Sequence, residues 1–274
     1  MAVTANRNPQ ARQMGDESMA RNLAHQANAI WQEEALLFER YQLSGEIRVL
    51  DLGCGTGEIT RRLAGRYPNA TLLGVDILEE NLAIARRSSA ALGERVRYEK
   101  GDAFALALPD AAFDLVTCRH MSQAVPHFEK VLAEITRVLR PGGWLHLLSE
   151  DYGMLHIPNG HFDSDRFWGE NALAFLRSVG CDGHIGRHTP PLLEAAGYRD
   201  VRMNYVIVDT LRVPRATFAG IIRAWRDGYV APLANANGRP EADVVRDFDA
   251  MIAAIETPPN YAVWHVPVAS ARKP

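Results

Sequence analysis

The sequence predicts an α/β protein with a mainly parallel β-sheet that carries helices on both faces. The first observation is a short apolar segment, residues 49–52, that runs into three glycines at alternate positions. The second is a repeated alternation of short apolar segments with amphipathic ones through residues 49–148. The third is an amphipathic stretch, residues 128–139, that ends at Pro141-Gly142-Gly143 before another apolar segment. This order is typical of parallel strands joined by crossover helices.

The expected elements follow in order along the chain. One or two helices are expected in residues 17–41, where apolar residues recur at helical spacing. The expected strands are residues 49–52, 71–75, 96–99, 113–117, 144–148, 201–211 and 261–268, and the expected helices between them are residues 58–64, 79–92, 128–139 and 190–196. Pro267 lacks an N–H donor, so the last residues of the final strand are expected at a sheet edge or outside the sheet.

Size, charge and cysteine content restrict the class of protein. The chain has 274 residues and 47% apolar residues, enough for a large core in one or two domains. The net charge of −3 and the lack of a long basic run argue against nucleic acid or an anionic membrane as partner. Cys54, Cys118 and Cys181 are few and far apart, which indicates reduced thiols. Residues 1–13 lack the apolar stretch of a signal peptide, so we expect a cytoplasmic protein.

The glycine segment predicts a ligand-binding turn. Gly53, Gly55 and Gly57 lack a Cβ, so they can adopt left-handed dihedrals and let a ligand approach the main chain. The dinucleotide fingerprint places its last glycine three residues after the second, whereas these three glycines alternate and Asp51 stands two residues before the first. The spacing therefore indicates a nucleoside site without a pyrophosphate.

Residues 49–57 resemble motif I of the class I S-adenosylmethionine-dependent methyltransferases, a hydrophobic strand followed by Asp-x-Gly-x-Gly-x-Gly. The resemblance implies S-adenosylmethionine as the cofactor and a Rossmann-like, mainly parallel seven-stranded sheet with an antiparallel last strand. It implies that the glycines line the methionine part of the cofactor and that the Asp holds the loop or the cofactor's amino group. The implied cofactor-binding residues of this segment are Asp51, Gly53, Cys54, Gly55 and Gly57. A glycine turn of some other α/β protein is the alternative.

Two acidic residues follow in the order that this family shows. Asp76 ends the second strand, where a carboxylate accepts hydrogen bonds from ribose hydroxyls, although it could instead cap the helix that follows. Ile77 would pack against the adenine ring. Asp102 and Ala103 match the family's Gly-Asp-Ala motif, which implies contact with adenine, although the Asp could equally be a turn former.

The ends of the fourth and fifth strands carry the candidate catalytic residues. His120 could abstract a proton, although a histidine beside a core strand is more often a packing residue. Glu150 and Asp151 are the other candidate bases, and Arg119 is expected to contact the cofactor or to order the loop. Residues 118–127 lack the Asn/Asp-Pro-Pro-aromatic motif of nucleic-acid amino methyltransferases, so a small-molecule acceptor is expected.

Three further segments are expected to cover the site of a single domain that spans residues 1–274. They are residues 1–41, 152–189 and 213–260, whose alternative role is simply to cover the sheet. The aromatic residues of the second segment could form the walls of an acceptor pocket. Its histidines lack the spacing of a metal site, so no metal is expected; they are His156, His161, His184 and His188.

The predicted function is methyl transfer to an O, N or C atom of a small, partly apolar or aromatic metabolite, and secondary metabolism is the expected context. The oligomeric state left open is a monomer or a homodimer. Two alternatives remain: an enzyme of the same fold that binds the cofactor but catalyses a different reaction such as cyclisation, and a non-catalytic binding subunit.

Overall fold

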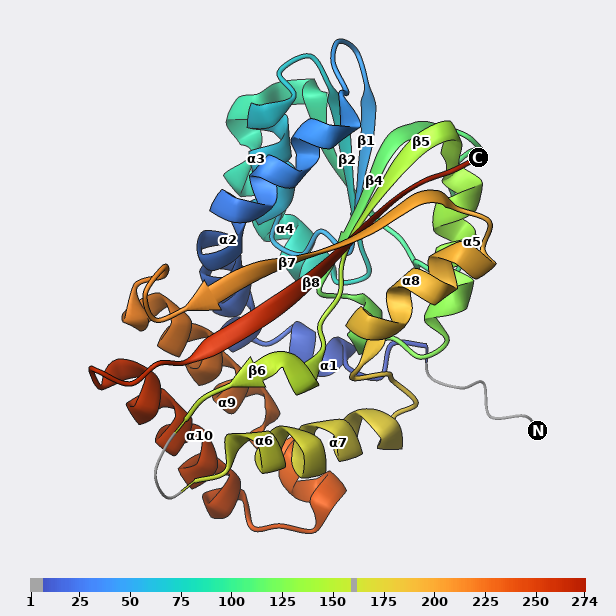
Figure 1. The fold of residues 1–274 in the computed structure, drawn as a ribbon. Coiled ribbons are helices and arrows are strands. Elements are labelled where there is room, and N and C mark those ends of the chain that lie inside the picture. Colours follow the sequence, from blue (N-terminus) through green and yellow to red (C-terminus); the bar gives the residue numbers. More distant parts are fainter. Residues whose placement is uncertain (1–6, 159–161) are drawn as a thin grey trace, which may run out of the picture.

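The computed structural model describes residues 7–158 and 162–274, so residues 1–6 and His161 lie outside the described part. Within that part the strands form one eight-stranded sheet (Figure 1). Its order is β3-β2-β1-β4-β5-β8-β6, with β7 paired to β8. The strands are β1 Arg48–Leu52, β2 Thr71–Asp76, β3 Val96–Lys100, β4 Phe113–Arg119, β5 Leu139–Leu148, β6 Leu155–His156, β7 Arg199–Asp209 and β8 Val263–Arg272.

The predicted fold class is confirmed. Strands β1 to β5 pair in parallel, and β8 lies antiparallel between β5 and β7. The described residues contain eight strands instead of the expected seven, because the two-residue β6 pairs with the first part of β8. The expected pairing of the last two long strands is also present, as Met203 lies opposite Ala269.

The expectation for Pro267 is wrong. The residues after it continue as an internal strand, with Val268 opposite Leu148 of β5 and Asn204 of β7. The Pro267 carbonyl accepts a hydrogen bond from the Ser149 N–H, so the proline nitrogen faces the same side of the strand. Because β5 ends at Leu148, the missing N–H falls where that ladder has already stopped.

Helices cover both faces of the sheet because strand side chains alternate between two cores. Val49 and Leu115 face one core with α2, α3 and α4, whereas Leu50 and Val116 face another with α5 and α8. The helices are α1 Ala11–Met14, α2 Glu17–Leu37, α3 Glu58–Arg66, α4 Glu79–Ser88, α5 Phe128–Val138, α6 Ser164–Phe167, α7 Leu173–Ser178, α8 Ile185–Ala195, α9 Arg215–Asn237 and α10 Glu241–Glu256. The helix expected at residues 190–196 therefore begins earlier, at Ile185.

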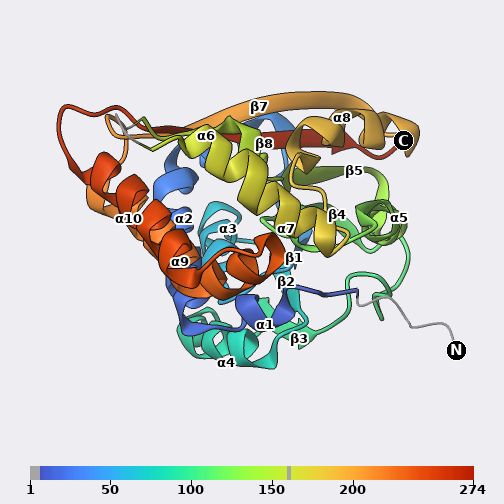
Figure 2. The same ribbon diagram turned by 90° about the horizontal axis from the view of Figure 1, so that it is seen from below.

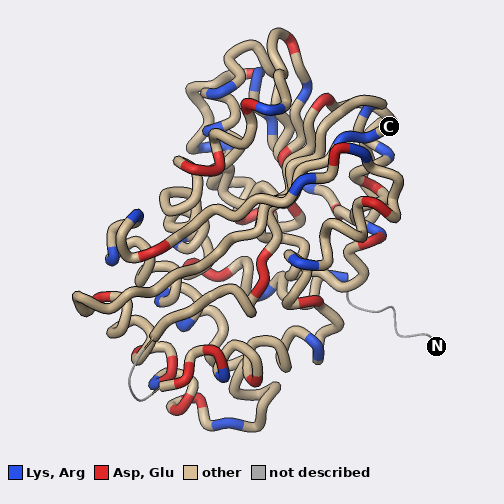
Figure 3. The backbone as a smooth tube through the Cα atoms, viewed as in Figure 1, with Lys and Arg blue, Asp and Glu red and all other residues tan. Residues whose placement is uncertain are grey.

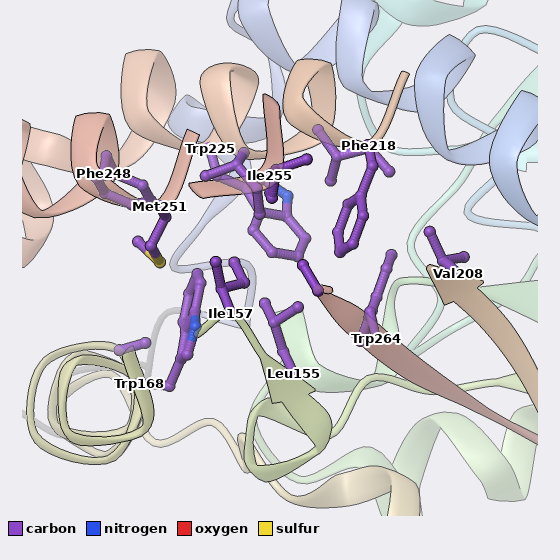
Figure 4. Packing of buried hydrophobic residues seen from close by; sticks show 14 of the residues in the cluster. Leu155, Ile157, Trp168, Val208, Phe218, Trp225, Phe248, Met251, Ile255 and Trp264 are labelled. Atoms are coloured by element: carbon purple, nitrogen blue, oxygen red, sulfur yellow. The ribbon is translucent and has the colours of Figure 1, made fainter. Parts of the chain in front are cut away.

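A third core joins the segments that lie outside the alternating pattern. Helices α6, α7, α9 and α10 gather at one end of the molecule (Figures 1 and 2). Trp168, Trp225 and Phe248 of these segments pack together beside Trp264 of β8 (Figure 4). The same core includes Leu148, the last residue of β5, so it adjoins the carboxyl end of that strand. Ligands bind at the carboxyl ends of the strands in such sheets.

Positively and negatively charged residues are interspersed along the described chain, without a long run of one sign (Figure 3). Helices α9 and α10 are joined by exposed ion pairs, among them Arg226–Asp249 at 2.6 Å and Arg223–Glu256 at 2.6 Å. Such exposed pairs add little to stability. In the described residues no helix has the length and apolar character needed to cross a membrane.

Candidate active site

The glycine loop, residues 53–57, forms one wall of a cavity at the carboxyl ends of β1, β2 and β4. We call this cavity the main cavity. Gly53 and Gly55 line it with φ values of 74° and 52°, which favour glycine. A Cβ on Gly55 would come within 2.6 Å of Leu23 Cδ1, and one on Gly53 within 3.0 Å of Met121 Sδ. Glycine is therefore required at both positions, because a side chain would clash with Leu23 or Met121, which line the same cavity. Gly57 lies instead at the start of α3, where a Cβ would meet the Tyr98 hydroxyl at 2.5 Å.

The acidic end of β2 forms the next part of the cavity wall. Asp76 and Ile77 both line the cavity. Asp76 Oδ2 accepts the Gly55 N–H at 2.8 Å, and its Oδ1 accepts the Leu78 N–H at 2.9 Å. Burial raises the pKa of Asp76, in opposition to these backbone hydrogen bonds. The carboxylate thus holds the glycine loop and still faces the cavity.

Only some of the residues that are expected to contact adenine line this cavity. Gly101 and Ala103 line it, whereas Asp102 is not among the described lining residues. Asp102 Oδ1 accepts the Phe104 N–H at 2.9 Å, and its Oδ2 lies 3.8 Å from Arg7 Nη1. Its carboxylate therefore organises the turn and holds the N-terminal segment.

Asp51 and Cys54 line a smaller neighbouring cavity together with Gly53, Arg119 and His120. Asp51 Oδ2 accepts the Thr60 hydroxyl at 2.6 Å, and its Oδ1 accepts the Thr117 hydroxyl at 3.1 Å. Burial raises the pKa of Asp51 despite these two hydrogen bonds. Burial also raises the pKa of the Cys54 thiol.

Arg119 lines both cavities and belongs to a buried network of charged side chains. Its Nε donates to Glu34 Oε1 at 2.7 Å, and both side chains are buried. Burial alone would raise the pKa of Glu34, but the Arg119 charge and the His146 hydrogen bond lower it to about 2. Burial lowers the pKa of His146, so the neutral ring donates from Nε2 to Glu34 at 3.0 Å and accepts the Tyr41 hydroxyl at Nδ1, 2.7 Å away. Among the described residues, Arg119 Nη2 is buried without a hydrogen-bond partner.

His120 and Glu150 form a buried pair at the adjacent ends of β4 and β5. His120 Nδ1 lies 2.8 Å from Glu150 Oε1, which also accepts from Gln26 Nε2 at 3.4 Å. Because a carboxylate only accepts hydrogen bonds, the imidazole donates from Nδ1, and in the neutral ring Nε2 then carries the lone pair. That Nε2 is buried and has no partner in the described part of the chain, and His120 lines the main cavity. Its φ of 53° is unusual for a residue other than glycine, as is typical of functional positions.

The Asp151 carboxylate is hydrogen-bonded to residues other than the His120–Glu150 pair. Its oxygens accept from Arg187 Nε at 2.5 Å and Nη2 at 2.8 Å, and His184 Nδ1 lies 3.0 Å away. Burial would raise the pKa of Asp151, but these hydrogen bonds and the Arg187 charge lower it. Asp151 therefore anchors α8 to the end of β5, and a role as the base does not fit this placement.

Sequence reasoning expected residues 1–41 to cover the site but missed Glu34, Gln10 and Met14 as residues that form it. Glu34 lies four residues after Ile30 and four before Phe38, so a charge on the apolar face of the helix was the available signal. Gln10 and Met14 line the main cavity, and no local pattern marks them. The rings of His184 and His188 lie 6.5 Å apart, but the described residues contain no group of three or more His, Cys, Asp or Glu side chains placed to hold a metal ion.

The wall residues fit S-adenosylmethionine. The partnerless Arg119 Nη2 would pair with the methionine carboxylate, and the Asp76 carboxylate would accept the ribose hydroxyls. Gly53 and Gly55 expose main chain to the cavity, where the methionine part of the cofactor would lie against them. Ile77 and Ala103 supply an apolar surface for adenine.

Known proteins resemble both the sheet region and most of the chain. A methyltransferase domain family model matches residues 49–143. The demethylmenaquinone methyltransferase of Thermus thermophilus is 46% identical over 151 residues, which cover 54% of this chain and 66% of that protein, just under two thirds. The ubiquinone biosynthesis O-methyltransferase of Pseudomonas fluorescens is 33% identical over 194 residues, 64% of this chain and 82% of that protein. Among solved structures, a Haemonchus contortus phosphoethanolamine N-methyltransferase 2 in complex with S-adenosyl-L-methionine has a TM-score of 0.63 to this chain. The two chains are 18% identical, and the match covers 100% of this chain and 61% of the Haemonchus chain.

The structural likeness shows the fold, and the sequence likeness shows the family. Identity of 33% extends over 82% of the ubiquinone biosynthesis O-methyltransferase, far beyond the glycine motif. The chain belongs to the class I S-adenosylmethionine-dependent methyltransferases.

Proposed function

We propose that this protein methylates a hydroxyl oxygen of a small, partly apolar acceptor. The observation that carries the proposal is the free Nε2 of His120, which is buried in the cavity wall while Nδ1 is held by Glu150. A base held in this way serves an acceptor that must lose a proton, such as a phenol or an enol. An amine already presents a lone pair and would not need it.

The chain's own residues would orient the acceptor and accept its proton. When bound, S-adenosylmethionine supplies a methyl group on a sulfonium, which is already a good leaving group. The His120 lone pair receives the hydroxyl proton, and Glu150 stabilises the imidazolium that results. Glu150 also accepts from Gln26 of α2, so the N-terminal helix helps to fix the pair.

The described parts of the segments 1–41, 152–189 and 213–260 would act as a cover that excludes water from this site. Leu23 of α2 and Gln10 line the main cavity, and α9 packs against α2. Water exclusion strengthens the interactions of charged groups and prevents loss of the methyl group to water. Relatives named for demethylmenaquinone methylation and for ubiquinone biosynthesis support a small ring-shaped acceptor.

The test is a screen of acceptors with the purified chain and S-adenosylmethionine. Matched phenols, enols and amines of similar size are compared, and S-adenosylhomocysteine and methylated product are measured together by mass spectrometry. We expect the two products in equal amounts with phenols or enols. Turnover of amines alone, or no S-adenosylhomocysteine with any member of the panel, would contradict the proposal.

Replacing Asp76 with Asn should weaken the binding of S-adenosylmethionine about 10- to 100-fold. Hydrogen bonds to a charged group contribute roughly 1.5–3 kcal/mol, and each 1.4 kcal/mol corresponds to about a tenfold change in affinity. Titration calorimetry gives the affinity, and Glu80→Gln on the exposed start of α4 is the control. If Asp76→Asn is folded and binds the cofactor as tightly as the parent chain does, the ribose assignment is wrong.

A further inference from the structure

A second cavity, which we call the aromatic cavity, lies within the third core, among the helices α7, α9 and α10. Its walls include η5, which spans Trp168–Ala172, and residues of α7, α9 and α10. Most of its wall is aromatic: Tyr152, Trp168, Phe175, Trp225, Tyr229 and Phe248. None of the described residues that line it is an Asp, Glu, Lys, Arg or His. Such a wall suits an uncharged, flat ring, since desolvating a charge there would be costly.

Trp168 presents a hydrogen-bond donor that the described protein does not use. Its side chain is 3% exposed, and its Nε1 has no partner in residues 7–158 and 162–274. Buried indole N–H groups usually find an acceptor. The residue begins a π-helical turn, a rare geometry that often occurs at functional sites. Both features point to a ligand oxygen at this place.

The aromatic cavity adjoins the His120–Glu150 pair. Gln10 lines both cavities, and its Oε1 accepts the Tyr229 hydroxyl at 2.9 Å. On the other side, Gln10 Nε2 donates to the Gln123 carbonyl at 3.3 Å, and Gln123 Nε2 donates to the His120 carbonyl at 2.9 Å. Gln10 is therefore the side chain shared by the two cavities, and a molecule that occupies both would have to displace it from these hydrogen bonds.

Tyr152 links the two sites from the other wall. Burial and the nearby Glu150 carboxylate raise the pKa of Tyr152, so it stays a neutral phenol. Its ring stacks on Trp168 with centroids 5.6 Å apart, and Trp168 meets Trp225 edge to face at 5.6 Å. Figure 4 shows the rings of Trp168 and Trp225 directed toward each other from separate helical segments.

We infer that the aromatic cavity binds the ring body of a neutral acceptor whose second oxygen, a carbonyl or an ether, accepts a hydrogen bond from Trp168 Nε1. This inference rests on the proposed function, in which a hydroxyl of the same molecule faces His120. It assigns Trp168 a role in specificity, because a buried donor left unpaired discriminates against a ligand without the oxygen.

The test measures binding and does not require turnover. The full chain is titrated by calorimetry with 4-methoxy-1-naphthol and with 1-naphthol, in the presence of S-adenosylhomocysteine. We expect the methoxy probe to bind about 5- to 20-fold more tightly than 1-naphthol. Trp168→Phe keeps an aromatic ring but removes the donor, so it should abolish this difference and leave 1-naphthol binding within about twofold. Trp31→Phe, on α2 outside the cavity, is the matched control and should preserve the difference.

Equal affinity of the parent chain for both probes, or an equal loss of both in Trp168→Phe, would overturn the inference. A second measurement uses the parent chain alone, in case Trp168→Phe does not fold. The methoxy probe should shift one indole N–H proton resonance downfield, and 1-naphthol should not. Because neither readout depends on methyl transfer, failure of the proposed function would show separately, as the absence of S-adenosylhomocysteine in the acceptor screen.

Discussion

Replacing His120 with Gln should lower kcat for methylation of a hydroxyl acceptor by about 10²- to 10⁴-fold, the usual contribution of a positioned general base. The amide can still donate to Glu150, so the pair keeps a hydrogen bond while the lone pair that receives the proton is lost. We expect the affinity for S-adenosylmethionine to stay within about threefold, because the proposed cofactor contacts come mainly from the glycine loop, Asp76 and Arg119.

Steady-state kinetics with a hydroxyl acceptor checks this prediction, because kcat should fall in His120→Gln while KM for S-adenosylmethionine changes little. His127→Gln, at an exposed histidine whose side chain is 60% accessible, is the control and should behave as the parent. An unchanged kcat in His120→Gln would show that no base acts at this position.

Replacing Glu34 with Gln should lower the free energy of unfolding by about 3 kcal/mol, because removing one partner leaves a buried charge uncompensated. Arg119 and His146 both use Glu34 Oε1, and the three side chains are buried. The variant should also weaken S-adenosylmethionine binding, since Arg119 would lose the contact that directs it toward the cavity. Urea unfolding and calorimetry measure the two effects, and Glu39→Gln, with a side chain 66% exposed, is the control.

The same network predicts how stability depends on pH. Charge pairing with Arg119 lowers the pKa of Glu34 from 4.5 to about 2 in spite of its burial, so its contribution is complete above pH 4.5 and is lost as the pH falls toward 2. Burial lowers the pKa of His146 from 6.5 in the folded chain. As the pH falls below 6.5, the unfolded chain therefore binds this proton before the folded chain does, and the free energy of unfolding decreases. In Glu34→Gln the additional loss below pH 4.5 should be smaller. An identical acid unfolding curve for the parent and the variant would contradict the assignment.

Local spacing predicted the parts of the site that lie within one segment. The alternating glycines and the acidic end of β2 are marked by a strand that runs directly into them, and the structure places Gly53, Gly55 and Asp76 on one cavity. His120 and Glu150 were separate candidates at the ends of two strands. Their contact follows from the parallel pairing of β4 with β5, which a sequence pattern indicates only in outline.

The remaining features depend on contacts between distant segments. Glu34 and Arg119 are 85 residues apart, and Gln10 meets Tyr229 across 219 residues. Neither pairing can be read from a local pattern, because one arises from how α2 packs on the sheet and the other from how the N-terminal segment packs on α9. The position of Pro267 inside the sheet was wrongly predicted for a similar reason, since it depends on where the neighbouring β5 ends. The placement of Asp151 depends likewise on Arg187 of α8.

The most direct test of the account uses S-adenosylmethionine with a deuterated methyl group and an acceptor found in the screen. Mass spectrometry and nuclear magnetic resonance of the product identify the atom that carries the label. We predict the deuterated methyl group on oxygen, with one S-adenosylhomocysteine formed for each labelled product, and loss of this product in His120→Gln. Label on carbon or nitrogen, or a product without label and without S-adenosylhomocysteine, would contradict the account.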